Sequence, residues 1–252
     1  MNGRHIIDLS GKVALITGGS RGLGREIALA YAEAGADVII ASRKFDACVA
    51  VAAEIEAMGR QALPIAANVG QWEGCDALIA AAYKRFGRVD ILVNNAGKSP
   101  LYDNLTNIDE RLYDSVLNLN LKGPFRLSAV IGERMAAGDG GSIINISSLA
   151  AIRPQKHVVT YAAAKAGMNA MTEAMADALG PKVRVNCIMP GPFLTDVSKA
   201  WDIKKFARRA LENIALRRGG EPEEIVGAAL YLASELSSYT TAAIIRIDGG
   251  CR

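Results

Sequence analysis

The stretch Val13-Ala14-Leu15-Ile16-Thr17-Gly18-Gly19-Ser20-Arg21-Gly22-Leu23-Gly24 decides the fold. Its first five residues form an apolar run typical of a buried strand, and the segment Leu23–Gly35 predicts a helix. Glycine between them allows a sharp turn, and a helix N-terminus presents free N–H groups to an anion. An ordinary glycine-rich turn is the alternative, but the order of strand, turn and helix favours a diphosphate site. The candidate residues are Gly18, Ser20, Arg21, Gly22, Leu23 and Gly24.

The same alternation of strand and helix continues along the chain. Further strands are expected at Val38–Ala41, Ala62–Ala66, Ile91–Val93, Ser142–Ile146, Arg184–Ile188 and Ile244–Ile247. Helical segments separate them, at Asp46–Met58, Gly74–Phe86, Asp109–Met135, Tyr161–Leu179 and Glu223–Ala233. Continuous apolar strands that alternate with helices predict an α/β fold, with a single Rossmann-type, doubly wound parallel sheet of about seven strands and helices on both faces.

Composition and charge exclude several classes of protein. Half of the 252 residues are hydrophobic, and the formal net charge is only +3, which does not favour a nucleic-acid partner. No apolar run has the length of a signal segment or a membrane span, so we expect a cytoplasmic location and no membrane contact. The cysteines are scattered without metal-ligand spacing, so we expect reduced thiols and no metal site. They are Cys48, Cys75, Cys187 and Cys251.

The end of the second strand indicates the cofactor. An acid at this position would accept hydrogen bonds from the ribose hydroxyls of NAD, but the strand ends in Ser42-Arg43-Lys44. Arg43 can pair with a 2′-phosphate, Arg21 is a second candidate, and Ser42 can donate a hydrogen bond. The alternative is that Arg43 and Lys44 are solvated charges. The missing acid and the basic side chains favour NADP(H).

Tyr161-Ala162-Ala163-Ala164-Lys165 places a phenol and an ammonium on one helix face. A nearby positive charge favours the phenolate, so we expect Lys165 to lower the pKa of Tyr161. Other polar residues follow the strands. Ser147-Ser148 ends the fifth strand, Asn94-Asn95-Ala96-Gly97 ends the fourth, and Asn120 lies inside the long helix.

With the glycine-rich turn, Pro190-Gly191 and Asp248-Gly249-Gly250, these motifs resemble the short-chain dehydrogenase/reductase family over nearly the whole chain. The resemblance implies that Tyr161 is the general acid–base and that Ser148 hydrogen-bonds the substrate oxygen. It implies that Lys165 also holds the nicotinamide ribose and that Asn120 binds a water molecule of a proton relay.

The resemblance also assigns cofactor contacts. Asn95, Ala96 and Gly97 are expected along the adenosine ribose, and Pro190 and Gly191 beside the nicotinamide. Thr195 is expected near the carboxamide. Two positions depart from the family pattern: Asn68-Val69 replaces Asp-Val near the adenine, and Thr241-Ala242 replaces Thr-Gly before the last strand.

The implied reaction is NADP(H)-dependent hydride transfer between a nicotinamide and a carbonyl or secondary alcohol, within one dinucleotide-binding and catalytic domain spanning residues 1–252. Reduction of a sugar, polyol or cyclic ketone is an alternative to a 3-oxoacyl thioester. A non-catalytic NADPH-binding sensor is an alternative of another class. Candidate substrate contacts are Ser99, Leu101, Leu149, Ile152, Gln155, His157, Phe193 and Trp201.

The helical stretch Val197–Arg218 interrupts the alternation, and we interpret residues 195–218 as a small helical lid insertion. It carries more bases than acids, which motivates the thioester hypothesis, although a solvated helix face is the alternative. The bases are Lys199, Lys204, Lys205, Arg208, Arg209, Arg217 and Arg218, and the acids are Asp202 and Glu212.

Small and apolar residues on the helices Asp109–Met135 and Tyr161–Leu179 indicate covered outer faces. With the family resemblance they imply a homo-oligomer, a tetramer or a dimer. Part of these faces could be ordinary core. The residues are Ala162, Ala163, Ala166, Met168, Met171 and Met175.

Overall fold

The computed structural model describes residues 7–196, 198 and 201–252. Seven strands form one sheet in the order β3-β2-β1-β4-β5-β6-β7, and every neighbouring pair is parallel. The order reverses between β1 and β4, which in doubly wound sheets opens a ligand crevice at the carboxyl ends. The strands are Val13–Thr17 (β1), Asp37–Ser42 (β2), Ala62–Ala66 (β3), Ile91–Asn94 (β4), Gly141–Ile146 (β5), Val183–Pro190 (β6) and Ile244–Ile247 (β7).

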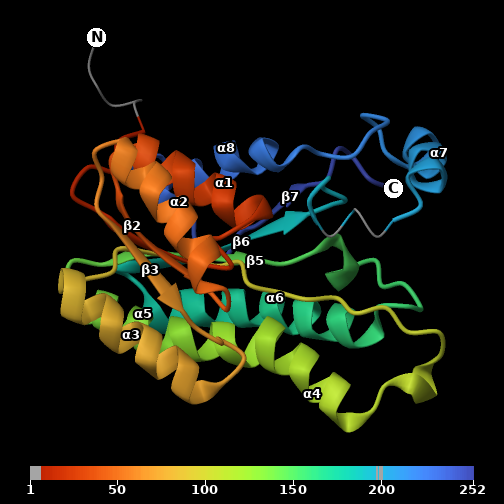
Figure 1. The fold of residues 1–252 in the computed structure, drawn as a ribbon, viewed down its shortest axis with the longest axis horizontal. Coiled ribbons are helices and arrows are strands. Elements are labelled where there is room, and N and C mark those ends of the chain that lie inside the picture. The colour runs from red at the N-terminus through yellow and green to blue at the C-terminus, as the bar shows by residue number, and fades with distance from the viewer. Residues whose placement is uncertain (1–6, 197, 199–200) are drawn as a thin grey trace.

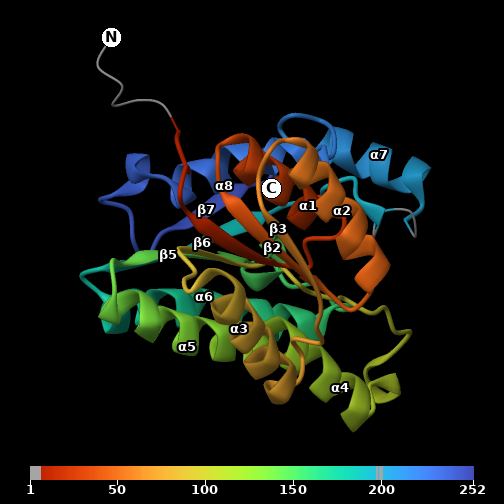
Figure 2. The same ribbon diagram turned by 60° about the vertical axis from the view of Figure 1, so that its left-hand side comes forward.

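Helices cover both faces of the sheet, as Figures 1 and 2 show. On one face lie α1 (Gly22–Glu33), α2 (Phe45–Ala57) and α8 (Val226–Ala233), and on the other α3 (Trp72–Phe86), α5 (Gly123–Ala137) and α6 (Val159–Leu179). Each layer has its own apolar core, one containing Ile27, Ile55 and Leu232 and the other Leu78, Leu127 and Leu179. The predicted doubly wound α/β fold is confirmed.

The helix predicted over Asp109–Met135 is not uniform. It consists of α4 (Glu110–Leu117), a π-helical turn at Asn118–Lys122 and α5. The wider turn lets the helix approach the loop after β3, where a Cβ on Gly123 would overlap the Val69 carbonyl oxygen. One extra residue in a helical turn does not change the apolar pattern of the sequence enough to be recognised, so the π-helical turn was not predicted.

The predicted helical stretch Val197–Arg218 is shorter in the structure. Helix α7 spans only Ile203–Asn213, and the Asp202 carboxylate caps it by accepting the Lys205 N–H at 3.0 Å. Val197, Lys199 and Ala200 fall outside the described residues. The helix predicted at Glu223–Ala233 consists of a 3₁₀ turn over Pro222–Ile225 followed by α8.

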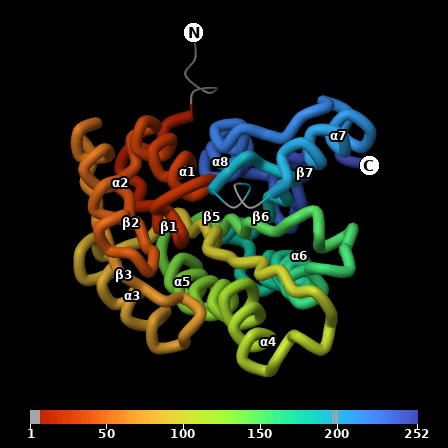
Figure 3. The backbone as a smooth tube through the Cα atoms, turned by 45° about the vertical axis from the view of Figure 1, so that its right-hand side comes forward, coloured from red at the N-terminus to blue at the C-terminus, as the bar shows by residue number. Residues whose placement is uncertain are grey.

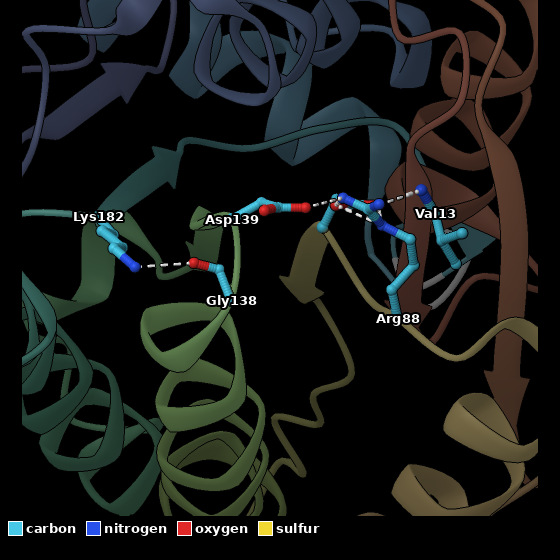
Figure 4. A network of polar contacts seen from close by, with 6 residues as sticks. Val13, Arg88, Gly138, Asp139 and Lys182 are labelled. Atoms are coloured by element: carbon cyan, nitrogen blue, oxygen red, sulfur yellow. Dashed lines mark hydrogen bonds and ion pairs between the residues drawn. The ribbon is translucent and has the colours of Figure 1, made fainter.

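A charged clamp holds the amino ends of the central strands, opposite the ligand edge (Figure 4). The Asp90 carboxylate accepts the Val13 N–H at 2.8 Å, and the Arg88 guanidinium pairs with the same carboxylate. Arg88 also faces Asp139 at 3.6 Å. This clamp fixes β1 against β4 before either strand reaches the cleft.

Ala242 stands where the family resemblance leads us to expect glycine. Its φ of 59° lies in the left-handed region that favours glycine. The backbone N–H of Ala242 donates to Val185, which keeps this turn against β6.

Among the described residues, no helix is long and apolar enough to cross a membrane. No group of three or more His, Cys, Asp or Glu side chains there could hold a metal ion. The cysteines are free thiols, and all but the partly exposed Cys251 are buried.

Candidate active site

A cleft of about 1800 Å³ follows the carboxyl ends of the strands. One end is lined by the residues after β2 and β3, including Arg43 and Asn68. The other end is lined by Ser148 and Tyr161, by the segment after β6 and by α7. The lining includes Ala47 of α2 and several residues of α7, and these two helices lie far apart in Figures 1 and 3, so the cleft is long. This shape suits an elongated ligand whose two ends differ in chemistry.

The glycine-rich turn has the geometry of a phosphate cradle. Gly18 has φ 66° and Gly22 has φ 52°, and a Cβ on Gly18 would lie 2.8 Å from Asn95 Nδ2. Asn95 Nδ2 donates to the Thr17 carbonyl at 2.9 Å and so fixes the turn. Helix α1 begins at Gly22 without a side-chain cap and without an acid in its first turn. Its first N–H groups can therefore bind an anion, and the turn fits the diphosphate of a dinucleotide.

The last two glycines of the turn, Gly22 and Gly24, differ in role. Gly22 lines the cleft beside Thr195, since a Cβ on Gly22 would lie 3.5 Å from Thr195 Cγ2. Gly24 is buried and does not line the cleft, and a Cβ there would overlap the Asn95 side chain. Thr195 therefore faces the phosphate turn, while Gly24 allows α1 to pack closely. Ser20, Arg21, Leu23, Ala96, Gly97, Pro190 and Gly191 also line the cleft.

The end of the cleft that follows β2 and β3 is basic. Arg21, Arg43 and Lys44 are exposed and line it, and β2 ends without an acid. The Ser42 hydroxyl donates to the Lys44 carbonyl at 3.2 Å, so it already has a partner within its own turn. Asn68 accepts the Gly70 N–H at 3.2 Å, and Asn68 and Val69 both line the cleft.

Sequence reasoning missed Lys98, which follows the asparagine-rich turn after β4. Its side chain is partly buried and lines the same cleft. Burial lowers its pKa, and the charges of Arg43 and Arg111 lower the pKa further. The loop after β4 therefore brings a further cation near Arg43, for which the local sequence gives no signal.

The two serines after β5 point in opposite directions, as the alternation along a strand predicts. Ser147 is buried and donates to the Lys165 carbonyl at 3.2 Å. Ser148 lines the cleft, accepts the Ala150 N–H at 3.2 Å and hydrogen-bonds Tyr161. A hydroxyl pair, Ser148 and Tyr161, therefore faces the cleft.

Lys165 is buried beneath this pair. Its ammonium donates to the Ile146 carbonyl at 2.7 Å and lies 5.8 Å from the centre of the Tyr161 ring. Burial lowers the pKa of Lys165 to about 8. Burial raises the pKa of Tyr161, and the hydrogen bond with Ser148 lowers it by less. The expectation that Lys165 lowers the pKa of Tyr161 is wrong for this structure, since the ammonium is directed at the strand.

Asn120 lies in the π-helical turn and is fully buried. Its Nδ2 donates to the carbonyls of Lys98 and Val116, each at 2.9 Å. A Cβ on Gly97 would lie 2.8 Å from Asn120 Oδ1 and 3.8 Å from Lys165 Nζ. The amide and the ammonium therefore border the same small space, which glycine leaves open. π-turns are frequent at functional sites, where they re-aim a side chain.

A buried polar chain supports the wall of the cleft formed by β5 and α6. Asn94 Nδ2 donates to Asn145 Oδ1, and Asn145 Nδ2 donates to the Thr172 hydroxyl, each at 2.9 Å. These bonds join β4, β5 and α6.

The N-terminus of α6 is capped by a residue that lies far away in the sequence, since the Tyr102 hydroxyl accepts the Val159 N–H at 2.7 Å and donates to the Lys156 carbonyl.

The expected substrate contacts lie together at the second end of the cleft, with one exception. Ile152 does not line it, whereas its neighbour Arg153 does. The rings of Trp201 and Phe206 pack in a tilted arrangement with their centres 5.1 Å apart, and both line the cleft. The residues placed as expected are Ser99, Leu101, Leu149, Gln155, His157, Phe193 and Trp201.

Comparison with known proteins supports this geometry. The model of a protein family described as enoyl-(acyl carrier protein) reductase matches residues 18–252. The 3-oxoacyl-[acyl-carrier-protein] reductase of Thermotoga maritima is 36% identical over 245 residues, covering 96% of this chain and 98% of the relative.

Two solved structures have the same fold. A 7α-hydroxysteroid dehydrogenase complexed with NADH and 7-oxo glycochenodeoxycholic acid has a TM-score of 0.94 and 34% identity, covering 100% of this chain and 98% of that one. L-sorbose reductase from Gluconobacter frateurii, complexed with NADPH and L-sorbose, has a TM-score of 0.91 and 30% identity, covering 98% of each chain. The chain therefore belongs to the short-chain dehydrogenase/reductase family and is a hydride-transferring oxidoreductase that acts on C=O or CH–OH groups.

Proposed function

We propose that the chain is an NADP(H)-dependent reductase of ketones, or dehydrogenase of the matching secondary alcohols. The observation that carries the proposal is the pair of cleft-facing hydroxyls, Ser148 and Tyr161, above the buried Lys165 and in the same cleft as the glycine-rich turn. When bound, the nicotinamide supplies or accepts the hydride. The protein contributes binding, orientation and proton transfer.

In the reductive direction, the Tyr161 hydroxyl donates a proton to the substrate oxygen. Ser148 donates a hydrogen bond to the same oxygen, so charge that develops there meets two donors. Lys165 holds the nicotinamide ribose. Asn120 holds a water molecule that reconnects Lys165 with solvent, and the open space beside Gly97 supports this assignment.

The proposed preference for NADP(H) rests on charge. Arg21, Arg43 and Lys98 line the adenosine end, and no acid ends β2. A guanidinium pairs with a 2′-phosphate through two parallel hydrogen bonds. The other proposed cofactor contacts are Gly18, Ser20, Gly22, Leu23, Ser42, Asn68, Val69, Asn95, Ala96, Gly97, Tyr161, Pro190, Gly191 and Thr195. Gly24, which does not line the cleft, supports the turn instead.

For the substrate, a 3-oxoacyl thioester is the first candidate. The basic α7 and the likeness to an acyl-carrier reductase support it. A sugar ketone is the second candidate, supported by the likeness to L-sorbose reductase. We further propose that residues 195–218 form a lid and that the protein works in the cytoplasm as a homotetramer. Ala163 and Ala166 on α6 are exposed and available to a second subunit, whereas Ala162 and Met168 belong to the core.

Turnover of a substrate panel tests the reaction. NADPH consumption is followed with an acetoacetyl thioester, a keto sugar, a diketone and a cyclic ketone. Replacing Tyr161 by phenylalanine removes the proton donor and should lower kcat by about a hundredfold to ten-thousandfold, with NADPH binding retained. Tight NADPH binding without turnover of any ketone by the wild-type protein would favour a sensor instead.

Exchange of Arg43 tests the cofactor preference. Arg43→Asp removes a phosphate partner and adds a repelling charge, so KM for NADPH should rise by about tenfold to a hundredfold. The KM for NADH should stay the same or fall, since Asp can accept from the ribose hydroxyls. Equal increases for both cofactors would contradict the role of Arg43 at the 2′-phosphate.

A further inference from the structure

The inner face of α7 carries two cations that the proposed reaction does not use. Lys205 and Arg209 line the cleft together with Phe206 and Ala210. Lys204 and Arg208 lie on the same helix but do not line the cleft. The helix therefore divides its four central basic residues into an inner pair and an outer pair, which have the same spacing of four residues.

Within the part of the chain that the structure describes, the inner pair has no anionic partner of its own. Among residues 7–196, 198 and 201–252, no ion pair or hydrogen bond joins the side chain of Lys205 or Arg209 to another group. Like charges four residues apart on one helix face repel each other. A bound anion would convert this repulsion into attraction to a shared partner.

The facing wall adds to the positive charge. Arg153 lines the same cleft, and its guanidinium donates to the Cys251 carbonyl at 2.8 Å. Cys251 pairs with Ile214, which directly follows α7, so Arg153 lies near the C-terminal end of that helix. Over the whole cleft, the described lining contains nine lysine and arginine side chains but only three acidic side chains. The acidic side chains are Asp103, Asp196 and Asp202, and Asp202 is occupied as the cap of α7.

We infer that Lys205 and Arg209, facing Arg153, form an anion subsite at the substrate end of the cleft. The substrate would then be a ketone or alcohol that carries a carboxylate or phosphate away from its reacting carbon. This inference rests on the proposed function and narrows its substrate class. The aromatic rings of Trp201 and Phe206 line the same cleft and would contact the uncharged part of that molecule.

The subsite explains why these positions are not apolar. A lid that only packs against the body would place apolar residues along its whole inner stripe, as Phe206 and Ala210 do. Charged-group hydrogen bonds are stronger than neutral ones, and an arginine can hold a carboxylate or a phosphate through two bonds. Lys205 and Arg209 therefore select for an anionic substrate.

Matched pairs of probes test the charge requirement. The anions are 4-oxopentanoate, 5-oxohexanoate, dihydroxyacetone phosphate and acetoacetyl-CoA. Their uncharged counterparts are the two methyl esters, dihydroxyacetone and an acetoacetyl N-acetylcysteamine thioester. In the wild-type protein, kcat/KM should be at least about tenfold higher for the anion of one pair. The length of the preferred anion, and whether it carries a carboxylate or a phosphate, identifies the class of anionic substrate.

Two double variants with equal charge change separate the inner pair from the outer pair. Lys205→Gln with Arg209→Gln should remove the preference, lowering kcat/KM for the anion to the value for its uncharged counterpart. Lys204→Gln with Arg208→Gln, the control, should keep the preference. Equal loss in both variants would overturn the subsite in favour of a general field of α7. Loss in the outer variant alone would also overturn the subsite, since the residues that line the cleft would then not select the anion.

A binding measurement separates this inference from the proposed function. Glutarate has no carbonyl to reduce, and its binding to the protein with NADPH present is measured by calorimetry. Binding that is lost only in the inner variant supports the subsite even if no ketone is turned over. Ketone turnover without glutarate binding and without preference for an anionic probe overturns the subsite and leaves the proposed reaction standing.

Discussion

The wall formed by β5 and α6 and the helix α7 are the two sides of one cleft, but they are built differently. The wall is tied together by buried bonds, among them those of Lys165 with Ile146 and of Asn145 with Thr172. In α7 only Ala210 is buried, and exposed Ile203 and Leu211 lie on its surface. The difference indicates that acid–base chemistry needs fixed distances, whereas substrate selection can rest on a loosely packed segment.

The largest effect is expected in the wall. Lys165→Met keeps most of the side-chain volume but removes the buried charge. If Lys165 orients the ribose and passes on protons, kcat should fall by about a hundredfold to ten-thousandfold. Steady-state kinetics measures this fall, and the control is the NADPH dissociation constant, which should change much less than kcat. A kcat within threefold of the wild-type value would contradict the proposed role of the wall.

The same variant should be more stable than the wild-type protein at pH 7. The pKa of Lys165 is lowered from about 10.5 to about 8, so its charged form is disfavoured in the folded state. That cost is fully present below pH 8 and disappears as the pH rises toward 10.5. Denaturant unfolding should show an advantage of about 3 kcal/mol for Lys165→Met at neutral pH, less the lost hydrogen bond. The advantage should shrink between pH 8 and 10.5, and a constant difference would contradict the lowered pKa.

In α7, replacing the large side chain of Phe206 by alanine should weaken substrate binding more than it lowers the stability of the fold. Phe206 contacts Trp201, and a Cβ on Gly219 would lie 3.2 Å from its ring. Phe206→Ala should raise KM for the substrate by about tenfold, since an aromatic pair and its packing are lost. The substitution should lower the free energy of unfolding by only about 1 kcal/mol, well below the loss of 3–5 kcal/mol that is typical when a buried phenylalanine is replaced by alanine.

The control for Phe206→Ala is Leu127→Ala in the fully buried core, which should lower stability by about 2–5 kcal/mol. If both variants lose the same stability in denaturant unfolding, α7 is as firmly packed as the wall. The contrast between the two sides of the cleft would then fail.

The smallest effect concerns the link between the loop after β4 and the wall. Tyr102→Phe removes the hydroxyl that caps α6 and should cost about 1 kcal/mol, as the loss of other caps does. Thermal unfolding should shift downward by about 2–4 °C. Replacing exposed Tyr239 by phenylalanine is the control, since its hydroxyl lies in solvent. A similar shift in both variants would show that Tyr102 does not cap the helix.

The sequence predicted the strands and the order of the motifs because both depend on local patterns. Apolar runs define β1 to β7 closely, and Ser148, Tyr161 and Lys165 meet in the structure as their spacing suggests. Ser147 and Ser148 could be told apart because side chains alternate along a strand.

What the sequence could not give depends on contacts between distant segments. The Tyr102 cap joins residues 57 positions apart, and Lys98 meets Arg43 only after the sheet has formed. The π-turn around Asn120 leaves the apolar pattern intact. The direction of the Tyr161 pKa was mispredicted because burial raises that pKa, and neither burial nor the direction of the Lys165 ammonium can be read from four-residue spacing.

The light packing of α7 has an evolutionary consequence. Its eleven residues can be exchanged without disturbing the strands that carry the chemistry, because the segment contributes little to the core. A descendant that acquires apolar residues at positions 205 and 209 would lose its preference for anionic substrates and would still catalyse the same reaction. New specificities would then arise by drift in one short helix, and a library restricted to residues 203–213 is the natural starting point for redirecting the enzyme.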